Sequence, residues 1–324
     1  MLVTLEDAKK LIEKGKVLHI AADESLLEQL PKGNWIAGTT PYFITEQGGI
    51  TCKDKLFVNE MDCAVEHKIS VYDKDNIFDI TKDSYSNGIT FLVMPFASDV
   101  AVYFAKEAPN SGDLLMNPTV GWITGFDLST DASAKVFDGS SGKSYGDKAV
   151  ALHICLPDDK IANLGIVNIF NIDEGDTKIE FTEDTLSVKK CLINGKEMFL
   201  YDYILENKIN TQLPLVADYN GTYINVSIKS VSEEDKTVDL YAPVFSGKVY
   251  RFSSPVSDYA VSFAEQLKEF KDLKPIFSCN CILNYLYGEL EGKATPPFAG
   301  PVTFGEIAYQ LLNQTLVYAV VTDK

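Results

Sequence analysis

One local pattern occurs three times, and it constrains the fold more than any other feature of the chain. The three copies are VLHIAADESLLEQL (17–30), FLVMPFASDVAVYFA (91–105) and LKPIFSCNCILNYL (273–286). Each starts with an apolar run typical of a strand and ends with apolar residues three and four apart, as on one face of a helix. Between these parts lie two small residues and an Asp or Asn. The pattern predicts a tight turn from strand to helix.

The polar residues at these turns are Asp23, Asp99 and Asn280. Asp and Asn are strong N-caps, because the side-chain oxygen accepts from the free N–H groups of the first helical turn. We therefore predict that each of the three begins a helix. The turns could be purely structural. They could also line a ligand cleft, because α/β sheets bind ligands at the carboxyl ends of their strands.

A second apolar segment follows each copy and contains one or two glycines: Gly38; Gly121 and Gly125; Gly300 and Gly305. The chain therefore contains three predicted strand-helix-strand units, two early and one late. The stretch 148–192 favours several short strands, and a helix is expected over about 256–270. We predict an α+β or mixed α/β fold with mixed sheets. Its two related domains would be 1–194 and 195–324, divided near Asn194 and Gly195.

The charge balance excludes some partners. The 324 residues carry a formal net charge of −17, and Arg251 is the only arginine. An acidic surface repels phosphate groups, so neither nucleic acid nor an anionic membrane is an expected partner. The longest apolar runs are too short to span a bilayer. The six cysteines are scattered, which indicates reduced thiols in the cytoplasm.

The sequence offers weak signals for catalysis. It contains no C-x-x-C pair and its three histidines lie far apart, so we expect neither a metal nor a cofactor. Cys279 lies near a predicted helix start, where the pKa of a thiol can fall. It could be a nucleophile, a buried thiol or a ligand contact. Glu306 and Gln314 could either close turns or hold a ligand.

The C-terminal motifs resemble those of the FIST family, predicted sensory domains of bacterial signal-transduction proteins. The matching residues are Phe277-Ser278-Cys279, Phe304-Gly305-Glu306-Ile307 and Asn313-Gln314-Thr315. The family often has an arginine after the cysteine, whereas this chain has NCILNY. The resemblance implies a FIST N-like and a FIST C-like domain. It also implies binding of a small metabolite, with amino acids proposed.

From these signals we expect a cytoplasmic sensory protein that binds a small polar metabolite in signal transduction. One alternative is a hydrolase or amide-processing enzyme that uses Cys279. Another is a scaffold for a separate signalling protein. The expected ligand-binding residues, at the late glycine turns and helix start, are Ser278, Cys279, Asn280, Phe304, Glu306 and Gln314. If the pocket is not there, we expect it at the early turns around Asp23 and Gly38.

Overall fold

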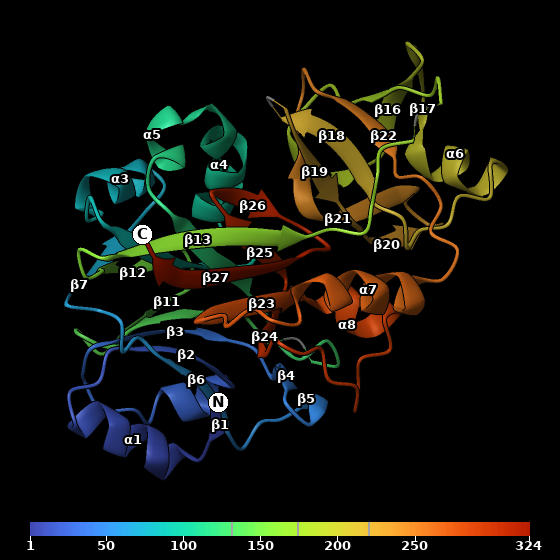
Figure 1. Cartoon of the computed structure of the whole chain (residues 1–324). Coiled ribbons are helices and arrows are strands. Elements are labelled where there is room, and N and C mark those ends of the chain that lie inside the picture. The colour runs from blue at the N-terminus through green and yellow to red at the C-terminus, as the bar shows by residue number, and fades with distance from the viewer. Residues whose placement is uncertain (131, 174, 220) are drawn as a thin grey trace.

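The structure of the protein, a computed structural model, describes residues 1–324 except 131, 174 and 220. It contains three six-stranded sheets, a further six-stranded sheet and a three-stranded sheet, with short helices around them (Figure 1). Parallel and antiparallel neighbours share the same sheets. The predicted mixed fold of α and β elements is therefore confirmed.

Each predicted strand-helix-strand unit is present, and in each the two strands are parallel neighbours. The first strands are β2 (Leu18–Ala22), β8 (Gly88–Pro95) and β23 (Phe277–Cys281). The helices that follow them are α2 (Glu24–Leu27), α4 (Asp99–Glu107) and α8 (Ile282–Tyr287). The second strands are β3 (Trp35–Thr39), β9 (Thr119–Thr124) and β24 (Gly300–Thr303).

The three units belong to three different sheets with the same strand order. The orders are β1-β6-β2-β3-β10-β11, β7-β12-β8-β9-β25-β26 and β13-β27-β23-β24-β4-β5. The outer antiparallel strands are β1 (Leu2–Val3), β6 (Leu56–Glu60), β7 (Glu66–Tyr72), β12 (Ala149–Cys155), β13 (Lys160–Val167) and β27 (Leu316–Asp323). The hairpins are β4 (Tyr42–Thr45) with β5 (Gly48–Thr51), β10 (Val136–Asp138) with β11 (Lys143–Tyr145), and β25 (Gly305–Ala308) with β26 (Gln310–Leu312).

The hairpins are exchanged among the units. Hairpin β4–β5 follows β3 in the chain but pairs with β24 of the third unit. Hairpin β10–β11 follows β9 but pairs with β3, and hairpin β25–β26 follows β24 but pairs with β9. Each hairpin thus covers the exposed edge of another unit's second strand, an edge that would otherwise present unpaired backbone groups. The exchange closes a ring of three.

Aromatic rings from the three first strands meet inside the molecule. The ring of His19 on β2 lies 6.0 Å from Phe91 on β8 and 5.0 Å from Phe277 on β23, and these phenylalanines are 5.6 Å apart. Trp122 Nε1 donates to His19 Nε2 over 2.8 Å. Burial lowers the pKa of His19 to about 3, so the imidazole is neutral and can accept this bond.

The remaining helices connect or flank these sheets. They are α1 (Leu5–Glu13), α3 (Ile80–Asp83), α5 (Gly112–Leu115) and α7 (Tyr259–Leu267), with 3-10 turns η1 (Ile77–Asp79), η2 (Ala108–Asn110) and η3 (Lys268–Phe270). The helix expected over 256–270 therefore corresponds to α7 with η3.

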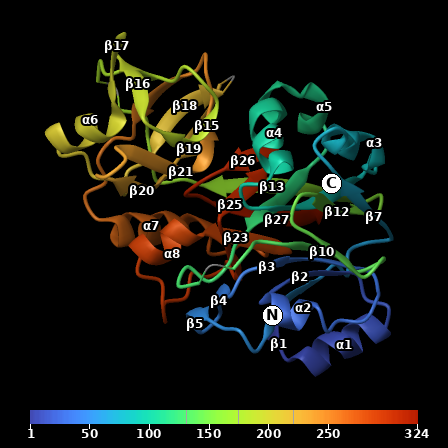
Figure 2. The same cartoon turned by 180° about the vertical axis from the view of Figure 1, so that it is seen from behind.

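An insertion between β13 and α7 forms a separate lobe, seen opposite the N-terminal unit in Figures 1 and 2. Its elements are β14 (Ile179–Glu180), β15 (Thr185–Val188), β16 (Lys190–Ile193), β17 (Lys196–Phe199), α6 (Leu200–Glu206), β18 (Leu215–Tyr219), β19 (Thr222–Val226), β20 (Ile228–Ser232), β21 (Thr237–Val244) and β22 (Val249–Phe252). The expected boundary near Asn194 and Gly195 falls in the β16–β17 hairpin of this lobe. Because strands beyond 195 also pair with β4 and β9, the division into 1–194 and 195–324 does not match the sheets.

The three predicted N-caps have different outcomes. Asp23 caps α2 and accepts from Ser25 N over 3.1 Å, as predicted. Asp99 is instead the first residue of α4, whose cap is Ser98. Asn280 lies in β23, and α8 follows Cys281 without a side-chain cap. Asn280 accepts from the Asn284 side chain rather than from a backbone N–H, which is why it does not cap.

We predict that Ser98→Ala lowers the free energy of unfolding by about 1 kcal/mol, because Ala101 N loses its side-chain acceptor. Asp99→Ala is the matched control. It leaves the cap in place and removes a first-turn charge worth about 0.3–1 kcal/mol. Urea unfolding of both variants measures the difference. A larger loss for Asp99→Ala would show that Asp99, not Ser98, is the energetic cap.

Candidate functional site

The six residues expected to bind a ligand in the late unit are buried. Each is at most 3% exposed: Ser278, Cys279, Asn280, Phe304, Glu306 and Gln314. The cavity beside Ser278, Cys279 and Asn280 has a volume of about 10 Å³. That volume is close to one water-sized sphere. The structure therefore brings these residues into the core, where a metabolite has no room.

Glu306 is the centre of this buried group and is fully hydrogen-bonded. Its Oε2 accepts from the backbone N–H and the hydroxyl of Thr315, over 3.2 and 2.9 Å. Its Oε1 lies 3.0 Å from the hydroxyl of Thr303, which is also 3.3 Å from the carbonyl oxygen of Asn280. Burial raises the pKa of Glu306 to about 8.

The protonated form of Glu306 explains this geometry. A threonine hydroxyl has one proton, so Thr303 cannot donate fully to both Glu306 and Asn280. If Glu306 carries a proton on Oε1, it donates to Thr303, and Thr303 donates on to Asn280. Both oxygens of Glu306 then have partners, and no unpaired charge is buried. Glu306 is thus a structural carboxylic acid that links three segments of the third unit.

Asn313 and Gln314 attach the inserted lobe to the body. Asn313 Oδ1 accepts from the backbone N–H of Ser227 over 3.0 Å, and Gln314 Oε1 accepts from its hydroxyl over 2.7 Å. Gln314 Nε2 donates to the carbonyl oxygen of Gln212 over 2.9 Å. Gln314 Nε2 also donates to the hydroxyl of Tyr259 on α7 over 3.1 Å. The insertion therefore pairs with the oxygens of both buried amides, whereas Asn313 Nδ2 has no hydrogen-bond partner among the described residues. The Asn-Gln-Thr motif therefore has a structural role.

Cys279 does not have the environment of a nucleophile. It lies within β23 rather than at a helix start, and its thiol is 3.4 Å from the carbonyl oxygen of Gly121. Burial raises its pKa well above the ordinary value, opposite to the lowering expected at a helix N-terminus. A catalytic thiol needs access and a nearby base, so this geometry does not support the Cys279 enzyme.

A polar pocket opens at the early turns, where the carboxyl ends of β2, β3 and β9 come together. Its volume is about 200 Å³. Thr39 O accepts from Gly125 N over 2.8 Å, which joins the ends of β3 and β9. The lining residues with charged or hydroxyl side chains are Asp23, Glu24, Thr39, Thr40, Lys53, Asp127, Thr130 and Ser133. Asp23 and the end of β3 are the fallback position expected from the sequence.

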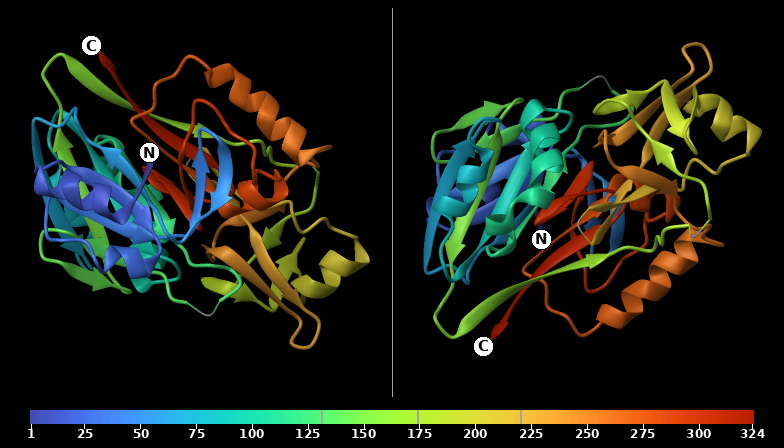
Figure 3. Two further views of the ribbon diagram at one scale, coloured as in Figure 1. Left: turned by 90° about the horizontal axis from the view of Figure 1, so that it is seen from below. Right: turned by 90° about the horizontal axis from the view of Figure 1, so that it is seen from above.

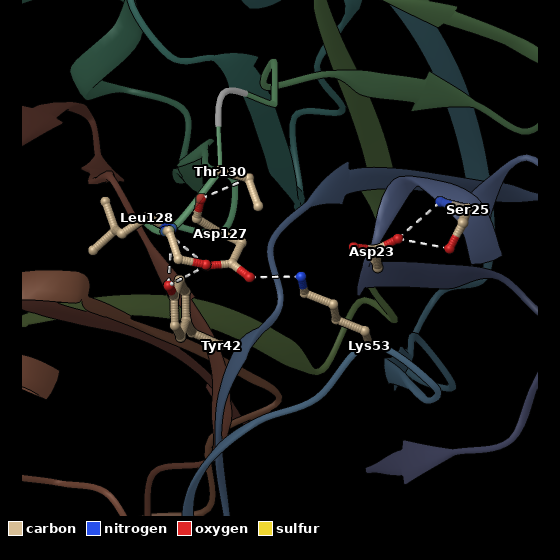
Figure 4. Close-up of polar contacts among 8 residues, drawn as sticks. Asp23, Ser25, Tyr42, Lys53, Asp127, Leu128 and Thr130 are labelled. Atoms are coloured by element: carbon tan, nitrogen blue, oxygen red, sulfur yellow. Dashed lines mark hydrogen bonds and ion pairs between the residues drawn. The ribbon is translucent and has the colours of Figure 1, made fainter.

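Lys53 is the cation of this pocket, and Figure 4 shows Asp23 and Asp127 on either side of its side chain. Its Nζ is 2.5 Å from Asp127 Oδ2 and also interacts electrostatically with Asp23. The Lys53 ammonium, with Ser129, holds the pKa of Asp127 below its usual range. One oxygen of Asp23 accepts from Ser25, as Figure 4 shows. The pocket thus carries more negative than positive charge but includes one ammonium.

The threonines of the pocket wall are committed to backbone contacts. Thr39 Oγ1 donates to Gly125 O over 2.8 Å and accepts from Lys135 N over 3.0 Å. Thr40 Oγ1 donates to Val302 O over 2.7 Å. Tyr42 accepts from Leu128 N, which fixes the loop that carries Asp127. These hydroxyls are therefore held by hydrogen bonds within the protein, which leaves mainly the charged groups to contact a ligand.

The equivalent position of the second unit is closed. The strand register aligns Thr39 of β3 with Thr124 of β9, because each pairs with the last residue of its unit's first strand. Beside Phe96 and Ile123, the second unit has a cavity of about 20 Å³. Tyr241 and Leu186 of the insertion line that cavity and cover it.

The third unit is closed as well. Its equivalent threonine is Thr303, which pairs with Cys281 at the end of β23. Next to it, the ring of Phe304 packs against Phe96, Phe126 and Tyr241, with centroid distances of 5.4, 5.2 and 6.1 Å. Of the three equivalent strand ends, the one in the first unit therefore keeps a polar pocket of about 200 Å³.

Sequence reasoning missed Lys53 and Asp127. Asp127 follows the glycine turn after β9, the same kind of turn that directed attention to Gly38. Lys53 is followed by Asp54 and Lys55 in the same loop, and nothing in the local sequence distinguishes Lys53 from Lys55. Lys53 lies in the loop between β5, in the third unit's sheet, and β6, in the first unit's sheet, whereas Asp127 follows β9 of the second, so their contact depends on how the sheets pack together.

The family comparison matches residues 3–322 to the family of unknown function DUF6976, so the chain belongs to this family. The match covers nearly the whole chain and is not to the FIST family, so the FIST assignment from the C-terminal motifs is wrong. Those motifs are accounted for by buried structural contacts of Glu306 and Gln314. No curated protein matches the chain.

Two further properties concern the described residues. Outside positions 131, 174 and 220, no group of three or more His, Cys, Asp or Glu side chains is arranged to hold a metal ion. In the same part of the chain, no helix has both the length and the apolar character needed to cross a membrane.

We predict that the stability of the native protein falls relative to Glu306→Gln as the pH rises from 5 to 8. In the unfolded chain Glu306 ionises near its ordinary pKa of 4.5, whereas the folded protein keeps the proton up to about 8. This stabilisation is complete below the unfolded pKa and is lost as pH rises through the folded pKa. The relative loss should be roughly 3–5 kcal/mol.

Denaturant unfolding of both proteins at several pH values measures this difference. Glutamine can reproduce the neutral network, accepting from Thr315 and donating to Thr303, whereas Glu306→Ala should cost at least about 2 kcal/mol at pH 5. The histidines are the same in all three proteins, so their titration cancels. Parallel pH profiles for the native protein and Glu306→Gln would contradict a protonated Glu306.

Proposed function

We propose that the protein binds a small zwitterionic metabolite, of the amino-acid class, in the polar pocket of the first unit. The observation that carries this proposal is the arrangement of Lys53 between Asp23 and Asp127. A ligand carboxylate would pair with Lys53, and a ligand ammonium would pair with Asp23 or Asp127. Charge-assisted hydrogen bonds of this kind are the stronger ones in proteins.

The size of the pocket supports a small ligand. Its volume of about 200 Å³ is below the range of roughly 300–1,000 Å³ that is usual for drug-sized molecules. The position also fits, because α/β sheets bind ligands at the carboxyl ends of parallel strands. Binding without catalysis is the favoured form, since the buried Cys279 offers no accessible nucleophile. The signalling role rested on the FIST resemblance and is not proposed.

We predict that small amino acids raise the melting temperature, whereas alkylamines and carboxylates of matched size do so less, because each offers one of the two charges. A ligand at 100 times its Kd adds about 2.7 kcal/mol to the free energy of unfolding. Differential scanning fluorimetry detects the shift, and calorimetric titration gives the Kd.

Two variants locate the site. Lys53→Gln should weaken binding about tenfold or more, since it removes the ammonium, while Lys55→Gln in the same loop should not change the Kd. Asp23→Asn keeps a good N-cap for α2 and removes one carboxylate, so it should weaken binding without loss of stability. If no amino acid binds, or if binding is the same in Lys53→Gln, the proposal is wrong.

We also propose that the protein works in a reducing compartment such as the cytoplasm, because all six cysteines are free. Alkylation of the denatured protein from its native host, without reductant, should label six thiols in a mass spectrum. Fewer labelled thiols would indicate a disulfide and an oxidising compartment.

A further inference from the structure

A second cavity is a groove that shares no lining residue with the polar pocket and is formed by other elements. Its volume is about 470 Å³. One wall is α7 with η3, at the outer edge of the molecule in both views of Figure 3, and the other wall is the segment from Gly288 to Pro296. This volume lies within the usual range for small-molecule sites.

The groove is apolar inside. Its floor includes Phe263, Leu267 and Leu290, each less than 7% exposed. Ala264 and Val261 continue the apolar surface along the outer face of α7, where Val261 is 51% exposed. The floor of the groove is therefore recessed, and Val261 lies at its exposed rim. A recessed apolar surface suits an inserted chain better than a flat partner.

The charged residues that line the groove are all lysines. Lys268, Lys271 and Lys293 line it, and none of its described lining residues is Asp or Glu. This local excess contrasts with the net charge of −17 for the chain. In the described part of the chain, Lys268 and Lys271 have no carboxylate within ion-pair distance, while Lys293 lies 3.4 Å from the exposed Glu289.

The helix dipole does not explain all three lysines. Lys268 and Lys271 follow the C-terminus of α7, where cations are favourable. Lys293, however, comes from the opposite wall and belongs to no helix. Cations on both walls of an apolar groove are what an amphipathic anion requires, with its chain against the floor and its head group between the lysines.

We propose that this groove binds a single-chain amphipathic carboxylate of the fatty-acid class. The alkyl chain would lie along Phe263, Ala264 and Leu267, and the carboxylate would be held by the lysines. The net charge of −17 repels anions from the molecule as a whole, whereas the lysines that line this groove attract an anionic head group. The proposal is independent of the polar pocket.

Calorimetric titration with decanoate below its micelle concentration tests the proposal. Decyltrimethylammonium has a chain of the same length and the opposite charge, and it should not bind. Lys268→Glu combined with Lys271→Glu should weaken decanoate binding about tenfold, because exposed charge pairs contribute modestly. Lys274→Glu, an exposed lysine of the same region that does not line the groove, is the matched control and should leave the affinity unchanged.

Ala264→Trp should fill the groove and abolish decanoate binding, while its circular dichroism and its melting temperature without ligand stay close to those of the native protein. Equal binding of the two amphiphiles, or no decanoate binding at all, would overturn the proposal. An unchanged decanoate affinity in Ala264→Trp would overturn it as well. Binding to phosphatidylcholine vesicles without binding to decanoate would also overturn it and would indicate that the groove contacts a membrane.

Discussion

The exchange of three hairpins is the constraint on which the rest of the structure depends. Each unit alone would leave the edge of β3, β9 or β24 unpaired, and each edge is instead covered by a hairpin from another unit. Each unit therefore needs a hairpin from one other unit to complete its sheet. Because these exchanges form a closed ring, the N-terminal and C-terminal parts of the chain must fold together. The triangle of His19, Phe91 and Phe277 is the packed centre of this arrangement.

The packing of the three units also determines which polar groups are buried and have a structural role. In the third unit, Glu306 is enclosed and remains neutral, because an ionised carboxylate at full burial would lack compensation. In the second unit, the insertion covers the strand ends with Tyr241 and Leu186. In the first unit, charged residues line a pocket of about 200 Å³ at the strand ends. Three similar turns thus have three different uses.

The two proposed sites differ in the physics of recognition. The polar pocket would select a ligand by two opposite charges, which lie in a frame of threonine and tyrosine hydrogen bonds. The groove would select by apolar burial, worth roughly 25 cal/mol per Å² of apolar surface, with lysines fixing the orientation. Because they share no lining residue, the loss of one should leave the other intact.

The sequence by itself determined the local units. Apolar runs, small residues and caps such as Asp23 specify a strand, a turn and a helix within about fifteen neighbouring residues. These units could therefore be predicted without knowledge of the tertiary structure. The exact caps were predicted less well: we predicted Asp99, whereas its neighbour Ser98, also a residue type that favours this position, caps α4. Only the tertiary structure decided how the units share hairpins, that Glu306 and Cys279 are buried, and that Lys53 meets Asp127. Residues 53 and 127 are brought together by packing between sheets, and local sequence carries no signal for a contact at that separation.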